Sequence, residues 1–120
     1  MTSAQIAEII GRIHFSFGRE VDLQDKIATV LTHHGITFHR EHSLSAADRI
    51  DFLAAGGLGI EVKIGGRRAD LLRQLYRYAG HQAIGELLVV TSLTRHLAGA
   101  PAELLGKPVR WAYLAGAVFQ

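Results

Sequence analysis

Apolar residues recur at helical spacing in the first third of the chain and predict two helices there. One amphipathic helix is predicted over residues 4–13 and a second over residues 19–34, which Gly35 ends. The apolar positions of the two stripes are Ile6, Ile9, Ile10 and Ile13 in the first and Leu23, Ile27, Val30 and Leu31 in the second.

The middle of the chain changes to the period of two that is typical of strands. Residues 36–44 alternate well enough for one strand, and residues 50–55 and 58–64 predict two more. Gly56 and Gly57 separate the last two runs, and such a pair has the positive-φ freedom that a two-residue hairpin turn requires. We therefore expect these two strands to form a hairpin.

The second half of the chain predicts a helix between strands. Residues 69–79 carry an apolar stripe that ends at Gly80, and residues 86–92 are a continuous apolar run, the pattern of a central strand covered on both faces. A strand, a helix and a strand in this order favour parallel pairing through a right-handed crossover. Residues 94–105 are expected to be a loop with one helical turn, and residues 107–114 the last strand. The predicted fold is an α/β domain with a mixed central sheet flanked by helices.

Composition narrows the class of protein. A chain of 120 residues with 48% hydrophobic residues and a mean hydropathy of +0.16 suits one folded domain. Without cysteine, disulfides, thiolate metal sites and cysteine nucleophiles are excluded. The longest stretch without charged side chains, residues 27–39, includes three histidines and is too short to cross a bilayer. No signal peptide is recognisable, so we expect a cytoplasmic protein.

Asp51, Glu61 and Lys63 form the candidate reactive cluster. Alternation places Glu61 and Lys63 on the strand face opposite Ile60 and Val62, and Asp51 can lie across the hairpin from Glu61. Two carboxylates are enough protein ligands for Mg²⁺, which keeps several waters and can take a phosphate. The Lys63 ammonium can orient and help deprotonate an attacking water, or offset charge on phosphate oxygens. The plain alternative is that Glu61 and Lys63 belong to a solvated strand face.

This arrangement resembles the signature of the PD-(D/E)XK nuclease superfamily. Residues 49–51 (Arg-Ile-Asp) are followed, after nine intervening residues, by residues 61–63 (Glu-Val-Lys). Ile50 stands where the family name has proline. Small members of the superfamily include Holliday-junction resolvases, phage nucleases and stand-alone VRR-Nuc domains.

The resemblance implies a three-layer, restriction endonuclease-like core and metal-dependent DNA cleavage, with an endonuclease favoured over an exonuclease. It implies Mg²⁺ or Mn²⁺ held at Asp51, Glu61 and Val62, with catalysis by Asp51, Glu61 and Lys63. We expect a single nuclease domain with its catalytic core over residues 19–92. An N-terminal helix and linker (1–18) precede the core, and a C-terminal loop and last strand (93–120) follow it.

Two further polar residues match positions of the superfamily. Glu20 projects from the same helix face as the core residues, and a first-helix glutamate reaches the metal-bound waters in many members. Gln74 precedes Tyr78 on the helix after the lysine strand, as in the RecB-like subset, and we include both Glu20 and Gln74 among the catalytic residues. The alternatives are a glutamate that stabilises a helix N-terminus and a glutamine without a role.

Positive charge is concentrated after the candidate cluster. Although the net charge is only +2, residues 61–81 carry five basic side chains against two acidic ones. Two of the arginines lie at a helix N-terminus, where an anion is favoured, so a DNA phosphate is the expected partner. A solvated arginine pair is the alternative. The predicted nucleic-acid-binding residues are Arg67, Arg68, Arg73 and Arg77.

Several other assignments complete the predictions. His33 and His34 are expected at a helix C-terminus and His39 and His42 on a strand surface, all without a catalytic role. The apolar tail, residues 115–120, suggests a subunit interface, so we expect a homodimer. Two other functions remain open from the sequence: a catalytically silent DNA-binding module of the same fold, and a small α/β interaction domain.

Overall fold

A computed structural model describes residues 1–15 and 18–114, and its centre is a mixed sheet of six strands. The strands lie in the order β1-β2-β3-β4-β6-β5. β1, β2 and β3 pair antiparallel, β3, β4 and β6 pair parallel, and β5 is antiparallel to β6. The strand bounds are β1 Phe38–Ser43, β2 Arg49–Ala54, β3 Leu58–Lys63, β4 Glu86–Thr91, β5 Glu103–Leu104 and β6 Lys107–Tyr113.

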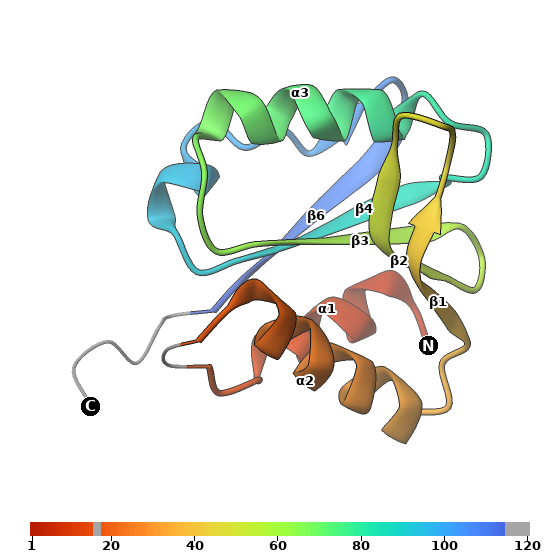
Figure 1. Ribbon diagram of the computed structural model, residues 1–120, viewed down its shortest axis with the longest axis vertical. Coiled ribbons are helices and arrows are strands. Elements are labelled where there is room, and N and C mark those ends of the chain that lie inside the picture. The colour runs from red at the N-terminus through yellow and green to blue at the C-terminus, as the bar shows by residue number, and fades with distance from the viewer. Residues whose placement is uncertain (16–17, 115–120) are drawn as a thin grey trace.

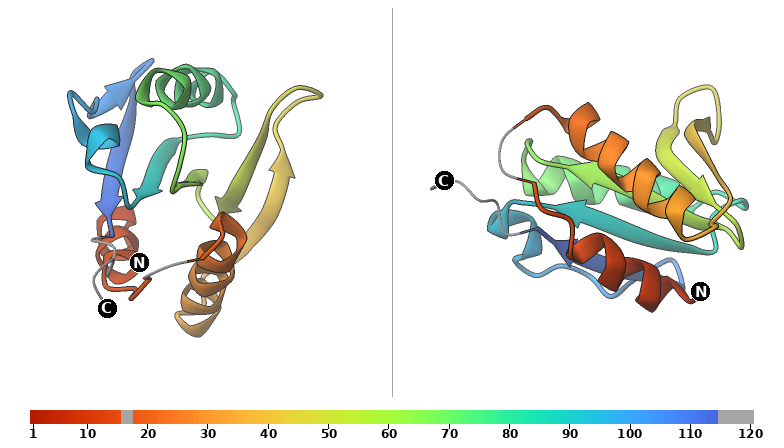
Figure 2. Two further views of the ribbon diagram at one scale, coloured as in Figure 1. Left: turned by 60° about the vertical axis from the view of Figure 1, so that its left-hand side comes forward. Right: turned by 90° about the horizontal axis from the view of Figure 1, so that it is seen from below.

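Helices cover both faces of this sheet, which makes three layers (Figure 1). Helices α1 (Ser3–Gly11) and α2 (Glu20–His33) lie side by side on one face, and α3 (Arg68–Ala79) covers the other (Figure 2). Each face has its own apolar core because the strands alternate. The core under α1 and α2 includes Phe52, Ile60, Val62, Leu88 and Val90, and the core under α3 includes Leu71, Leu75, Tyr78, Leu87 and Val89. The predicted α/β class with a mixed sheet flanked by helices is confirmed.

β4 is the central strand that its apolar run predicted. Leu87 and Val89 face α3, Leu88 and Val90 face the opposite core, and all four are fully buried. β4 pairs in parallel with β3 on one side and β6 on the other, and α3 connects β3 to β4. The predicted strand, helix and parallel strand are therefore confirmed.

The hairpin between β2 and β3 differs from the prediction. Ala54 pairs with Leu58, so the turn has three residues and β2 ends one residue earlier than expected. Gly56 and Gly57 have φ of 82° and 79°, so glycine is needed at the turn as predicted. The Gly57 carbonyl accepts hydrogen bonds from the N–H groups of Gly85 and Glu86. These bonds join the turn to the start of β4, a tertiary contact that the dipeptide could not reveal.

Two other segments refine the sequence-based expectations. The loop after β4 contains the expected helical turn, η1 (Thr94–Leu97), but also the short strand β5, which was not predicted. α1 begins after Thr2, whose hydroxyl accepts the Gln5 N–H as a helix cap. The apolar tail assigned to a subunit interface lies outside the described residues. Over residues 1–15 and 18–114, no helix has the length and apolar character needed to traverse a bilayer.

Candidate functional site

Asp51 and Glu61 lie where β2 and β3 separate. The paired register of these strands ends at Phe52 and Ile60, so Asp51 and Glu61 no longer pair through their backbones. Instead, Asp51 Oδ2 accepts the Val62 N–H at 2.8 Å, and Glu61 Oε1 accepts the Asp51 N–H at 3.3 Å. Each carboxylate therefore accepts a backbone N–H of the other strand, as a backbone carbonyl does in regular pairing. The exchange holds the two acids together at one point of the sheet.

The same point is irregular on the β1 side. Arg40 pairs with Phe52 and His42 with Ile50, but Glu41 and Asp51 between them do not pair. Glu41 has a φ of 50°, an unusual backbone conformation for a glutamate. β2 thus loses regular pairing with both of its neighbours at Asp51, whose N–H and carboxylate bond to Glu61 and Val62 instead.

Glu61 is buried and Asp51 is half-buried, so both carboxyls resist ionisation. Glu61 is only 2% exposed. Burial, and then the negative charge of Asp51, raise the pKa of the Glu61 carboxyl to about 8. Burial also raises the pKa of Asp51 to about 6, with Glu20 and Glu41 acting in the same direction and the Val62 N–H opposing them. The alternative of a solvated strand face is therefore wrong for Glu61.

Lys63 and Glu20 complete the cluster at the end of β3. Lys63 Nζ lies 3.7 Å from Glu61 Oε2, and its side chain is 28% exposed. Glu20 Oε1 accepts the Ile64 N–H at 3.3 Å, so the first residue of α2 reaches the end of β3. Glu20 and Lys63 also line a common cavity of about 300 Å³. The structure thus brings Glu20, which is more than thirty residues earlier in the sequence than Asp51, to the cluster of Asp51, Glu61 and Lys63.

Gln74 lies on α3 beside a second cavity, of about 320 Å³, that also contains Lys63. Its Nε2 donates to the Tyr78 hydroxyl at 2.8 Å, and that hydroxyl donates to the Arg49 carbonyl at 2.8 Å. Gln74 therefore contacts β2 through Tyr78, two residues before Asp51. We predicted that Gln74 reaches the end of a neighbouring strand, and the structure shows that it does so only through the Tyr78 hydroxyl. The cavity is lined by Lys63, Gly65, Gly66, Arg67, Asp70, Leu71, Arg73, Gln74 and Arg77.

The four arginines assigned to DNA have different positions. Arg67 and Arg73 flank Asp70 and pair with it, so an acid of the chain itself lies at the N-terminus of α3. Both line the larger cavity together with Arg77. Arg68 instead donates to the carbonyls of Ala98 and Gly99 in the loop after η1. Three of the four arginines are therefore placed beside Lys63.

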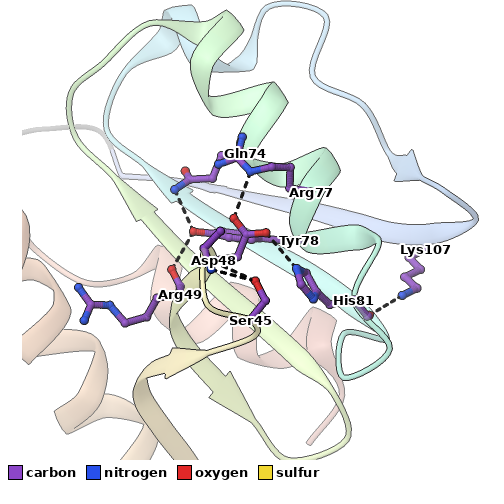
Figure 3. Close-up of polar contacts among 9 residues, drawn as sticks. Ser45, Asp48, Arg49, Gln74, Arg77, Tyr78, His81 and Lys107 are labelled. Carbon is purple, nitrogen blue, oxygen red and sulfur yellow. Dashed lines mark hydrogen bonds and ion pairs between the residues drawn. The ribbon is translucent and has the colours of Figure 1, made fainter.

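Asp48 is the centre of a polar network that sequence reasoning missed. It is 8% exposed and accepts hydrogen bonds from Arg77 Nε at 3.1 Å and His81 Nε2 at 2.9 Å (Figure 3). The bonds from His81 and Arg77 hold the pKa of Asp48 below its usual value. These partners lie 33 and 29 residues further along the chain, so no local spacing indicated them. The network ties the segment before β2 to α3.

A second missed network fixes the loop that follows β3. The Gly66 carbonyl accepts from the Arg95 guanidinium and from His96 Nε2, while His96 Nδ1 accepts the Thr91 hydroxyl at 2.7 Å. Thr91 and His96 are both fully buried. The end of β4 and the η1 turn therefore hold the Gly65 and Gly66 backbone that lines both cavities.

The chemistry of the acids suits a hard divalent cation. Two adjacent carboxylates fit Mg²⁺, and a cation would favour their ionised forms against burial. The Val62 side chain is fully buried in the opposite core, so its backbone carbonyl is the atom it can offer. Among the described residues, no three His, Asp or Glu side chains gather as a complete metal site. Any cation at Asp51 and Glu61 would therefore rely on water or substrate oxygens for most of its ligands.

The histidines lie where the sequence placed them. His33 ends α2 and His34 follows it, and both are exposed. His39 and His42 lie on β1 with their ring centroids 5.7 Å apart. None of the four lines the two cavities beside Lys63.

Comparison with known proteins adds no family to this geometry. No protein-family model, curated protein or solved structure matches the chain. The functional argument therefore depends on the site itself.

Proposed function

We propose that this protein is a divalent-metal-dependent DNA endonuclease with a PD-(D/E)XK-type core. One observation carries the proposal: two carboxylates, Asp51 and Glu61, are held together at a break in the sheet with Lys63 Nζ 3.7 Å from Glu61. Burying Glu61 beside the half-buried Asp51 costs folding free energy, and strongly raised pKa values are characteristic of functional sites. The order of these residues along the chain also agrees with the superfamily signature.

Asp51, Glu61 and the Val62 carbonyl would hold Mg²⁺ or Mn²⁺. The bound ion would supply a Lewis acid and lower the pKa of a water. Lys63, beside Glu61, would orient the attacking water or offset charge on the phosphate oxygens. Glu20, whose side chain reaches from α2 to the end of β3, would accept a hydrogen bond from that water and fix its direction. Gln74 would position the start of β2 through Tyr78 and Arg49.

Positively charged side chains beside the cluster would bind the DNA backbone. Arg67, Arg73 and Arg77 line the cavity that contains Lys63, and all three side chains are more than half exposed. Their guanidinium groups carry several donors each, so one ion pair with Asp70 or Asp48 leaves donors for phosphate oxygens. Arg68 would not contact DNA, because its guanidinium group holds the loop after η1 through the Ala98 and Gly99 carbonyls.

A silent DNA-binding module is the second candidate. The observation that favours it is that the Asp51 and Glu61 carboxyl groups already accept hydrogen bonds from the backbone N–H groups of the neighbouring strand. Glu61, with its raised pKa, can also persist as a neutral acid. A neutral Glu61 needs no cation. The two candidates differ in whether added metal ionises Glu61 and supports cleavage.

The decisive experiment measures cleavage of supercoiled plasmid, single-stranded circles, linear duplex and four-way junctions in Mg²⁺ or Mn²⁺. Asp51→Asn, Glu61→Gln and Lys63→Ala should each lower the rate by orders of magnitude, and EDTA should abolish it. Asp25→Asn, the same change on an exposed side chain of α2, is the matched control and should cut normally. Lys63→Ala should still bind DNA in Ca²⁺.

The pattern of products assigns the activity. Nicked or linearised circles indicate an endonuclease, attack only at free ends indicates an exonuclease, and preference for junctions indicates a resolvase. Equal cleavage by the parent protein and Asp51→Asn would contradict the proposal. DNA binding without cleavage of any substrate would support the silent module.

A further inference from the structure

An apolar groove lies on the flank of α3 away from the candidate site. Leu72 and Tyr76 of α3 form one wall, and Pro101 and Leu104 of the segment after η1 form the other. Its volume is about 610 Å³, within the range of roughly 300–1,000 Å³ that ligand pockets have. Tyr76 is 55% exposed, so its ring is available to a ligand. Leu72, Pro101 and Leu104 are partly buried around it, so an exposed aromatic ring and a hollow lie together on this flank of α3.

Two arginines connect this groove to the proposed cleavage site. Arg73 and Arg77 line the apolar groove and also the cavity that contains Lys63. They lie along the outer ridge of α3, with Gln74 on the flank toward the cavity and Tyr76 on the flank toward the groove. A chain that crosses this ridge would therefore meet a polar cavity, two guanidinium groups and an apolar groove in turn.

The charge around the groove selects the kind of ligand. Within the part of the chain that the structure describes, the groove has Arg73 and Arg77 in its lining and no acidic side chain. Arg73 pairs with Asp70 and Arg77 with Asp48, but both guanidinium groups are more than half exposed and keep donors for further oxygens. An apolar surface with such donors at its edge complements a ligand with flat apolar groups on an anionic backbone. A single strand of nucleic acid has this chemistry, because its bases stack on aromatic rings and its phosphates bind arginine.

A second copy of the chain fits the groove less well. A twofold contact would place the same surface on both partners, so it would bring two pairs of these arginines together. Asp70 and Asp48, which pair with these arginines, lie outside the groove lining, so the partner's guanidinium groups would meet no acid within the contact and would disfavour it. An unpaired nucleotide avoids this repulsion.

We propose that the groove is a subsite for an unpaired base of single-stranded DNA. The base stacks on Tyr76, the adjoining phosphates bind Arg73 and Arg77, and the strand continues over α3 toward Lys63. The inference rests on the proposed function and narrows its substrate to DNA with unpaired nucleotides, such as single strands or flaps. A blunt duplex keeps its bases paired and cannot place one in the groove.

Binding without cleavage provides the test. Fluorescence anisotropy in EDTA would compare a labelled oligothymidine with a labelled blunt duplex on the parent protein, Tyr76→Ala and Tyr76→Phe. Loss of one base stack should weaken binding of the single strand by roughly 5- to 100-fold in Tyr76→Ala. Tyr76→Phe keeps the ring and should bind like the parent. Duplex affinity should change little in either variant, and circular dichroism should verify that both fold.

Single abasic replacements in the oligothymidine sharpen the test. One position should weaken binding to the parent protein as much as Tyr76→Ala does, and should have no further effect in that variant. Such non-additivity would identify the base that occupies the groove. Purely additive losses at every position would overturn the proposal.

Other outcomes are equally decisive. Equal losses on single strand and duplex, no loss, or no binding of the single strand would overturn the inference. A change of molecular mass in Tyr76→Ala, with unchanged oligonucleotide affinity, would assign the groove to a protein contact. If Tyr76 governs single-strand binding but no substrate is cut, the subsite stands and the nuclease proposal fails. If cleavage requires Asp51 but single-strand binding and cleavage do not depend on Tyr76, the nuclease proposal stands and the subsite fails.

Discussion

Glu61 has the most costly environment of any acidic side chain in the proposed site. It is almost completely buried, with Asp51 on one side and Lys63 on the other. An ionised carboxylate there must be compensated by nearby positive charge, and Lys63 at 3.7 Å gives only partial compensation. Protonation or a divalent cation would remove the remaining penalty. Glu61 therefore couples the stability of the fold to pH and to metal.

This coupling predicts that the metal-free protein loses stability as pH rises. The pKa of Glu61 is raised from 4.5 to about 8, so its proton stabilises the fold at low pH and that contribution disappears as pH approaches 8. Urea unfolding in EDTA should show the free energy of unfolding falling between about pH 5 and 9, by a few kcal/mol at most. Mg²⁺ should restore stability at pH 8.

Glu61→Gln separates this effect from other titrations. The neutral variant should keep the fall that Asp51, with its pKa raised to about 6, contributes at lower pH, but should be much flatter between about pH 7 and 9. Mg²⁺ should no longer stabilise it. Asp48 does not interfere, because His81 and Arg77 lower its pKa and its contribution is lost only in acid. A parent protein whose stability rises steadily from pH 5 to 9 in EDTA would contradict a buried, protonated Glu61.

At the level of elements, the site depends on where the antiparallel pairing of β2 with β3 ends. Ile50 lies in the core under α3 although Phe52, two residues later, lies in the opposite core. The strand therefore changes its facing pattern around Asp51, where pairing is also lost. Gly59 on β3 makes room for Ile50, because a Cβ there would lie 2.6 Å from Ile50 Cδ1. The irregularity that frees Asp51 is thus supported by a glycine on the neighbouring strand.

Gly59→Ala should test this packing. The added methyl would also lie 2.8 Å from Ile84 Cδ1 and 3.1 Å from Leu87 Cδ2, so overpacking should lower the free energy of unfolding by about 1–3 kcal/mol. Ile50→Val, which removes the nearest methyl, should recover part of that loss in the double variant. Denaturant unfolding provides the measurement. Gly11→Ala, where a Cβ meets nothing within 4 Å, should be neutral or slightly stabilising.

At the level of the whole molecule, the prediction is a homodimer. A 13.1 kDa domain offers a small footprint for DNA, and two copies would present two sites to two strands. Light scattering at tens of micromolar should report twice the chain mass. A variant that ends at Leu114 tests whether the apolar tail forms the contact, and Tyr76→Ala should leave the mass unchanged if its groove binds DNA. A parent protein that remains monomeric would contradict the prediction.

The sequence by itself determined most of the elements, though not β5, and the facing of the key residues. The spacing of apolar residues, every two positions in strands and every 3.6 in helices, can be read from residues close together in the sequence. It therefore predicted α2, α3, the buried strand β4, and the placement of Glu61 on the strand face opposite Ile60. The contact between Asp51 and Glu61 also followed, because one short turn connects their strands.

Only the tertiary structure decided the environment of these residues. The burial of Glu61 comes from the elements that pack around β3, and the partners of Asp48 come from 29 and 33 residues away. The turn between β2 and β3 has three residues, and the Gly57 carbonyl accepts hydrogen bonds from Gly85 and Glu86 at the start of β4. Such contacts depend on how whole elements pack against one another. Local sequence patterns describe one element at a time, so they could name the acids but not the burial that perturbs their pKa values.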